Sequence, residues 1–216
     1  MSKQTAPILI CVVLVSALSA CGGTPAGALQ YSGPSEQTIG LGLAMPGTNI
    51  QYIAKNAEGA LVDIGGQRAV KKVGDSLDWK GEPMSGVEVA LAQRVVFANE
   101  EHLQTAGTVK ITVRDAQPST AQFPDNPAYS YAVPVTYNVR RGSEIPGTLL
   151  RYAGKRDEGA ALEGVSGYAF RRLGDSITWN GRLRSNAYVD MTLRVLAYTD
   201  DFMQVGGVVT VALTGE

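Results

Sequence analysis

The amino-acid sequence predicts an all-β protein made of two tandem antiparallel β-sandwich domains. Three observations lead to this prediction. The chain repeats itself at an interval of 100 residues, and apolar residues alternate with polar ones in the longest segments of each copy. The 25 glycines and 10 prolines are also spread along the chain, as the turns between many short strands require.

The repeat can be aligned without a gap. Residues 46–113 fall on residues 146–213, and 21 of the 68 aligned pairs are identical. About 4 identities would be expected from composition alone. The longest shared motif reads Gly-Asp-Ser, then a tryptophan and a glycine, at 74–81 and 174–181. Two copies are too few for a solenoid, so each copy is expected to be a domain.

Composition also suggests where the domains begin and end. We expect a signal peptide at 1–20, a tether at 21–34, the first repeat at 35–115, a linker at 116–128 and the second repeat at 129–216. The linker contains three prolines and no apolar period. Because proline fixes φ and removes a backbone donor, this segment is expected to be partly extended.

The strands of each copy are expected in the same order. Leading strands at 37–43 and 132–140 are followed by strands at 48–55 and 148–155. Short strands then follow at 69–73 and 77–79, with copies at 169–173 and 177–179. The long strand at 87–97 alternates, with Val87, Val89 and Leu91 on one face and Glu88 and Arg94 on the other. Its copy is 187–197, and the last strands are at 108–114 and 208–213.

A Gly-Asp turn, a Trp-x-Gly motif and a long strand of alternating valines occur together in both copies. This combination resembles the immunoglobulin-like repeats of bacterial surface proteins. The resemblance covers about 40 residues of each copy and implies a sandwich architecture. It implies no ligand and no activity.

The first twenty residues contain a short apolar run that ends in Leu18-Ser19-Ala20, immediately before Cys21. This pattern resembles the lipoprotein signal of bacteria. The resemblance implies cleavage before Cys21 and acylation of its thiol and of the new N-terminus. Two or more acyl chains hold a protein stably on a membrane. The run is shorter than the about 20 residues of a transmembrane helix. We therefore expect a lipid-anchored protein of the cell envelope, on an outer membrane or on the outer face of the plasma membrane.

Charge and composition bear on several functional classes. The chain has 19 basic and 20 acidic residues, and this balance disfavours a nucleic-acid partner. Cys11 lies in the signal peptide and Cys21 would be acylated, so no disulfide is expected. A single histidine and the absence of a cysteine pair argue against a zinc site. No metal and no cofactor are expected. The acidic pairs at 100–101 and 200–201 are interpreted as solvated loop charge.

Gly74-Asp75-Ser76-Leu77 spells the motif of the GDSL hydrolases, in which the serine is the nucleophile. That chemistry needs a histidine base beside the serine. The only histidine, His102, is replaced by Phe202 in the second copy, although the serine is kept there. We therefore interpret the motif as a turn in which an Asp or Ser oxygen accepts backbone hydrogen bonds, and we expect no enzymatic activity.

Several side chains are candidates for contact with a partner. Trp79 and Trp179 are interpreted as core residues, with a sugar-stacking platform as the alternative. Arg94 and Arg194 are each expected to pair with a carboxylate of their own domain, and the alternative is that they bind an anionic partner. The second repeat is locally more basic and more aromatic than the first. We therefore place the contact surface around three of its residues, Arg182, Arg184 and Tyr188.

The sequence thus favours a non-enzymatic envelope lipoprotein that binds or scaffolds through two β domains. Two alternatives remain open at this point. One is a carbohydrate- or peptidoglycan-binding module that uses Trp79 and Trp179. The other is a subunit of an envelope secretion or transport assembly, which an exposed sheet edge would favour because such an edge can accept a strand from a partner.

Overall fold

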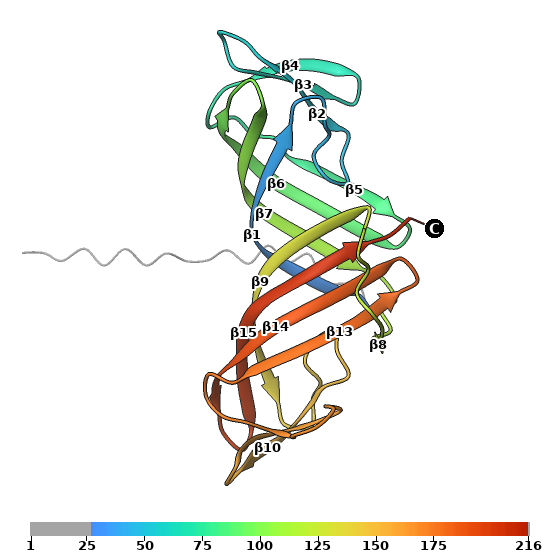
Figure 1. The fold of residues 1–216 in the computed structure, drawn as a ribbon, viewed down its shortest axis with the longest axis vertical. Helices are drawn as coiled ribbons and strands as arrows, with labels where there is room; N and C mark the ends of the chain where they lie inside the picture. The colour runs from blue at the N-terminus through green and yellow to red at the C-terminus, as the bar shows by residue number, and fades with distance from the viewer. Residues whose placement is uncertain (1–26, 216) are drawn as a thin grey trace, which may run out of the picture.

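The computed structural model describes residues 27–215, and these residues form strands and no helix (Figure 1). The prediction of an all-β protein with antiparallel sheets is therefore confirmed. The signal peptide and the acylated Cys21 lie outside the described residues. Between residues 27 and 215, no helix has the length and apolar character that a membrane crossing requires.

The first repeat forms two antiparallel sheets. The larger sheet has four strands in the order β1-β7-β6-β5, and the smaller is the three-stranded meander β2-β3-β4. The strands are β1 (Leu29–Gly40), β2 (Ile50–Lys55), β3 (Ala60–Ile64), β4 (Gln67–Lys71), β5 (Trp79–Met84), β6 (Val87–Ala98) and β7 (His102–Val113).

The second repeat has the same plan with one addition. Its larger sheet has five strands in the order β8-β13-β14-β15-β9, and its smaller sheet has the order β10-β11-β12. The strands are β8 (Ser119–Thr120), β9 (Tyr129–Arg140), β10 (Arg151–Arg156), β11 (Gly159–Glu163), β12 (Phe170–Arg171), β13 (Ser176–Arg184), β14 (Ala187–Tyr198) and β15 (Phe202–Leu213).

The 100-residue interval of the sequence reappears in the strands. β9, β14 and β15 have the bounds of β1, β6 and β7 shifted by 100 residues. The alternation expected for the long strand is also present, because Val87, Val89 and Leu91 of β6 are buried while Arg94 on its other face is exposed. The period-two pattern therefore identified the inner face of this strand correctly.

Two strands lie in segments where no strand was expected. β1 begins at Leu29, inside the segment expected to be a tether, and β8 lies inside the segment expected to be a linker. Gly33 and Pro34 hid the start of β1, because both residues are poor strand formers. Pro34 is tolerated because β1 is an edge strand of its sheet, where a missing N–H breaks no ladder.

The two repeats meet along β1 and β9, which pack against each other in the middle of the molecule, with the small meanders at its opposite ends (Figure 1). Tyr31 and Tyr131 occupy equivalent places in this contact, and both are buried. The hydroxyl of Tyr131 reaches Gly47 of the first repeat, and that of Tyr31 reaches Gly147 of the second. A Cβ at either glycine would collide with the facing hydroxyl, so each glycine leaves room for the other repeat.

A single hydrophobic cluster contains buried residues of both repeats. It includes Val89 and Ile111 of the first large sheet and Val189 and Val211 of the second. The repeats thus share apolar surface that neither would bury alone, and this shared burial fixes their relative position.

Candidate functional site

Trp79 and Trp179 each lie against the glycine two residues further along the same strand. A Cβ at Gly81 or Gly181 would collide with the ring of the tryptophan beside it. Trp179 is only 8% exposed, and Trp79 is half-buried and packs against the core. The interpretation of Trp179 as a core residue is therefore confirmed, and the Trp-x-Gly motif exists because the ring needs a residue without a side chain beneath it.

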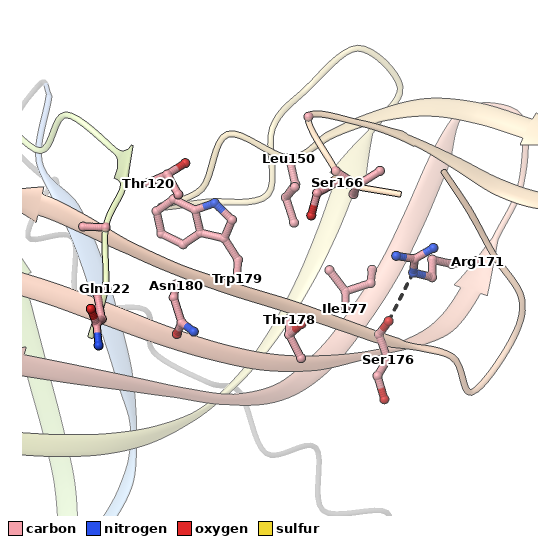
Figure 2. Close-up of a pocket in the computed structure, with 13 residues that line it drawn as sticks. Thr120, Gln122, Leu150, Ser166, Arg171, Ser176, Ile177, Thr178, Trp179 and Asn180 are labelled. Carbon is pink, nitrogen blue, oxygen red and sulfur yellow. Dashed lines mark hydrogen bonds between the residues drawn. The ribbon is translucent and has the colours of Figure 1, made fainter. Parts of the chain in front are cut away.

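The ring of Trp179 nevertheless forms part of the wall of a hollow on the second repeat, which we call the β13 trough. Figure 2 shows the linker residues Thr120 and Gln122 on one side of the ring and Leu150 and Ser166 on another. The trough has a volume of about 500 Å³. It is lined by Thr120, Ala121, Gln122, Leu150, Gly164, Val165, Ser166, Arg171, Ser176, Ile177, Thr178, Trp179 and Asn180.

One edge of β13 is open along the trough. β13 pairs with β14 along its full length, but on the other side β8 pairs only with Gly181 and Arg182. The carbonyl of Ser176 turns to this other side, because it accepts a hydrogen bond from Nε of Arg171 at 3.2 Å. Main-chain groups point to alternate sides along a strand, so the N–H and C=O of Thr178 also point to the open side. No described residue pairs with Thr178 there.

Arg171 closes one end of the trough (Figure 2). Besides Ser176, its guanidinium donates through Nη1 to the carbonyls of Tyr168 and Phe170. These bonds fix the side chain without neutralising it, because carbonyl oxygens carry no net charge. Arg171 is the only charged residue that lines the trough. The trough is therefore a cationic site with one open strand edge and an aromatic wall.

The first repeat lacks the covering strand. Among residues 27–215, β5 pairs with β6 alone, whereas the equivalent β13 carries β8 on its outer edge. Both strands have a bulge at equivalent places, between Gly81 and Met84 in β5 and between Arg182 and Arg184 in β13, but Pro83 stands where the second repeat has Leu183. A proline protects a sheet edge from pairing with another strand, because it lacks an N–H. The open edge that an assembly subunit would need is therefore better developed at β13.

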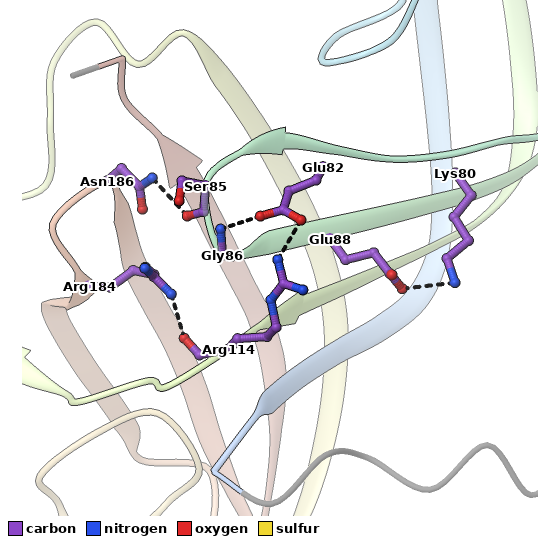
Figure 3. Close-up of polar contacts among 8 residues, drawn as sticks. All are labelled: Lys80, Glu82, Ser85, Gly86, Glu88, Arg114, Arg184 and Asn186. Carbon is purple, nitrogen blue, oxygen red and sulfur yellow. Dashed lines mark hydrogen bonds and ion pairs between the residues drawn. The ribbon is translucent and has the colours of Figure 1, made fainter.

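The three residues expected to form a contact surface are separated. Arg182 and Tyr188 are cross-strand partners on β13 and β14, and Arg182 is exposed. Arg184 instead turns toward the first repeat, where its Nη1 donates to the carbonyl of Arg114 at 2.8 Å (Figure 3). A substituent at Gly86 would collide with this guanidinium. The structure thus places Arg184 in the contact between the repeats.

Polar contacts surround Arg184 at the junction of the two repeats (Figure 3). Asn186 donates through Nδ2 to the carbonyl of Ser85 at 3.0 Å, and Arg114 forms an ion pair with Glu82. The hydrogen bond from Arg114, together with one from the N–H of Gly86, lowers the pKa of the Glu82 carboxyl. The bonds from Arg184 and Asn186 join the two repeats, and those of Glu82 lie within the first, so all these residues are already engaged within the chain.

The expected pairing of Arg94 and Arg194 with carboxylates is wrong. Each guanidinium donates through Nη1 to a main-chain carbonyl at 2.9 Å, that of Gly74 in the first repeat and of Gly174 in the second. The arginines therefore brace the turn before β5 and β13. No carboxylate of the described residues forms an ion pair with either.

The interpretation of the Gly-Asp-Ser motif as a turn is confirmed. Oδ2 of Asp75 accepts the N–H of Lys72 at 2.8 Å, and Oδ2 of Asp175 accepts that of Arg172 at 2.7 Å. His102 lies at the start of β7, where its ring packs against Phe97 at 5.9 Å between centroids. The acidic pairs at 100–101 and 200–201 lie in the exposed turns between β6 and β7 and between β14 and β15. Residues 27–215 contain no cluster of three His, Cys, Asp or Glu side chains that could hold a metal ion.

Sequence reasoning singled out Trp179 but missed the trough. Its walls come from five separate segments, which are the linker at 120–122, Leu150 before β10, the loop at 164–166, Arg171 of β12 and β13 itself. Ser119 and Thr120 are compatible with a strand, although the segment around them is rich in proline. This pair was the one signal in the sequence that the linker forms a strand. No pattern in the sequence indicates the hydrogen bond between Arg171 and Ser176.

Comparisons with protein-family models, with curated proteins and with solved structures found no match to this chain.

Proposed function

We propose that the protein is a non-enzymatic binding module of the bacterial cell envelope and that it engages its ligand at the β13 trough. One observation carries the proposal. The second repeat combines an open strand edge, an aromatic wall and a fixed cation in one hollow of about 500 Å³. Ligand sites are concave surfaces in which polar groups converge beside apolar ones, and the trough brings Arg171 together with Trp179.

The proposed protein consists of two sandwich domains and is anchored to a membrane by lipid. Each repeat is an immunoglobulin-like sandwich, supported by its pair of antiparallel sheets, one large and one small. A lipid on Cys21 holds the chain on an outer membrane or on the outer face of the plasma membrane, supported by the residues that precede this cysteine. The shared core and the contacts at the junction then present the trough on a rigid body.

A glycan is the second candidate ligand. The observation in its favour is the lining of the trough, in which Trp179 lies among the hydroxyl groups of Thr120, Ser166 and Thr178 and the amides of Gln122 and Asn180. Sugars combine hydroxyl groups with apolar faces that stack on aromatic rings. However, Trp179 is too deeply buried to offer a flat platform, so this candidate ranks below the first.

The proposal is tested by capture from detergent-solubilised envelopes of the native host, with the full lipoprotein carrying a C-terminal tag. Three forms are compared, namely wild type, Cys21→Ala and Thr178→Pro. Proline at 178 removes an N–H that pairs with no described residue. Without this donor, the open edge can no longer form a complete pair of main-chain hydrogen bonds with a ligand strand at this position. A ligand that depends on Thr178 is expected, and it should be recovered less well when the Cys21 anchor is lost.

Thr178→Val is the matched control, because valine keeps the N–H and the strand propensity while it removes the side-chain hydroxyl. This variant should capture the same ligand as wild type. Equal capture by the Thr178→Pro form would contradict binding at the trough, and capture that is indifferent to Cys21→Ala would contradict the role of the anchor.

A further inference from the structure

We propose that the ligand of the β13 trough is a short extended peptide with a free C-terminal carboxylate, which adds to β13 as an antiparallel strand. The inference rests on the proposed function and names its ligand class. Three features lead to it, namely the length of the open edge, the position of Arg171 and the direction of β8.

The open edge fits a few peptide units. β8 stops pairing at Gly181, and Arg171 binds the carbonyl of Ser176, so the free stretch of β13 is 177–180. A strand rises about 3.4 Å per residue, so this stretch is about 14 Å long and matches an extended peptide of about four residues. Within this stretch, both the N–H and the C=O of Thr178 face the open side. They can therefore form a pair of hydrogen bonds with one residue of an added strand. Strand addition of this kind draws affinity from main-chain bonds.

The charge of the trough selects the end of such a peptide. Arg171 is its only charged lining residue, and Nε and Nη1 of its guanidinium are held by carbonyl oxygens. Its Nη2 donates no hydrogen bond to the described residues. A carboxylate placed there would receive a charge-assisted hydrogen bond without rearrangement of the side chain, because the guanidinium is already held in place.

The direction follows from β8, which already pairs with this edge. β8 runs antiparallel to β13, with Thr120 opposite Gly181 and Ser119 opposite Arg182. A peptide that continues the path of β8 along the edge would run from Asn180 toward Ser176. Its C-terminus would then lie at Arg171, so the polarity of the strand and the charge of the arginine agree.

The test is a nuclear magnetic resonance titration of the full chain in detergent. The probes are an acetylated tetrapeptide pool, randomised at all four positions, with either a free C-terminal carboxylate or a C-terminal amide. The free-acid pool is expected to shift the amide signals of Thr178 and Asn180 and the indole N–H signal of Trp179. It should bind at least about tenfold more tightly than the amidated pool, because only the free acid places a carboxylate at Arg171.

Two variants test whether peptide binding depends on the main-chain N–H of Thr178. Thr178→Pro should abolish the shift at Trp179, and Thr178→Val should keep it. Equal binding of the two pools, or unaltered binding to a folded Thr178→Pro variant, would overturn the proposal. Peptidoglycan fragments that lack peptide are titrated as well. A shift of the Trp179 signal by these fragments, with no response to either pool, would overturn the proposal that the ligand is a peptide and leave the trough as the binding site. No response to any of these probes would contradict both the peptide and the trough.

Discussion

The hydroxyl groups of Tyr31 and Tyr131 offer a sharp test of how the two repeats are joined, because the residues are equivalent in sequence but differ in their bonds. Oη of Tyr131 donates to the carbonyl of Pro46 at 2.8 Å. Oη of Tyr31 is buried and has no hydrogen-bond partner among the described residues. Burial raises the pKa of both phenols, so both hydroxyl groups are neutral near pH 7.

Replacement by phenylalanine removes only the hydroxyl oxygen and should therefore act differently at the two positions. Tyr131→Phe loses a hydrogen bond that contributes about 0.5–1.5 kcal/mol. Pro46 is half-buried, so water can reach its carbonyl in part. We therefore expect the free energy of unfolding to fall by about 1 kcal/mol in total. Tyr31→Phe removes a buried polar group that has no described partner. It should leave the free energy of unfolding unchanged or raise it by up to about 1 kcal/mol.

The assay is urea unfolding of both variants and of wild type, with midpoints compared at a constant slope m. Wild type should lie between the two variants or coincide with Tyr31→Phe. Equal destabilisation by both substitutions would show that the two contacts are equivalent and would refute the reasoning. A change in m for either variant would mean that the repeats no longer unfold together.

Three further predictions concern the strands and the turns. Gly181→Ala should lower stability by about 1–3 kcal/mol and change the fluorescence of Trp179, because the new methyl group occupies the place of the ring. Burial raises the pKa of Tyr137 to about 12, and a buried phenol favours the neutral form. The contribution of Tyr137 to the free energy of unfolding should therefore be constant below about pH 10 and fall as the pH rises from there toward 12, as measured by urea unfolding. Asp175→Ala should cost about 1 kcal/mol, because the N–H of Arg172 loses its acceptor, whereas Asp175→Asn keeps an oxygen there and should cost less in the same assay.

The sequence was sufficient to predict the strands that follow a simple pattern. The 100-residue repeat and the alternation of Val87, Val89 and Leu91 predicted β6 and its copy, because a half-buried strand needs one apolar face. The Gly-Asp turn was also predictable, since a short side chain that caps a turn acts locally. Trp179 was correctly interpreted as a core residue, because an equivalent tryptophan occurs in both copies and this suits a shared core.

The contacts between distant segments were not predictable in this way. β1 extends back to Leu29 through Gly33 and Pro34, because these residues pair with β7 of the same repeat and pack against β9 of the other, and both partners are distant in sequence. Arg184 belongs to the junction of the repeats because Arg114, 70 residues earlier in the chain, presents a carbonyl to it. The trough depends on where the linker crosses β13, and one sequence has no periodic signal for that.

The most direct test of ligand binding at the trough is amide hydrogen exchange at Thr178, measured residue by residue. The free protein is compared with the complex that the tagged lipoprotein captures from solubilised envelopes. In the free protein this amide should exchange rapidly, because its N–H faces the open edge. We expect exchange at Thr178 to slow in the complex while exchange along β5 stays the same. Unchanged exchange at Thr178, with new protection elsewhere, would contradict binding at the trough.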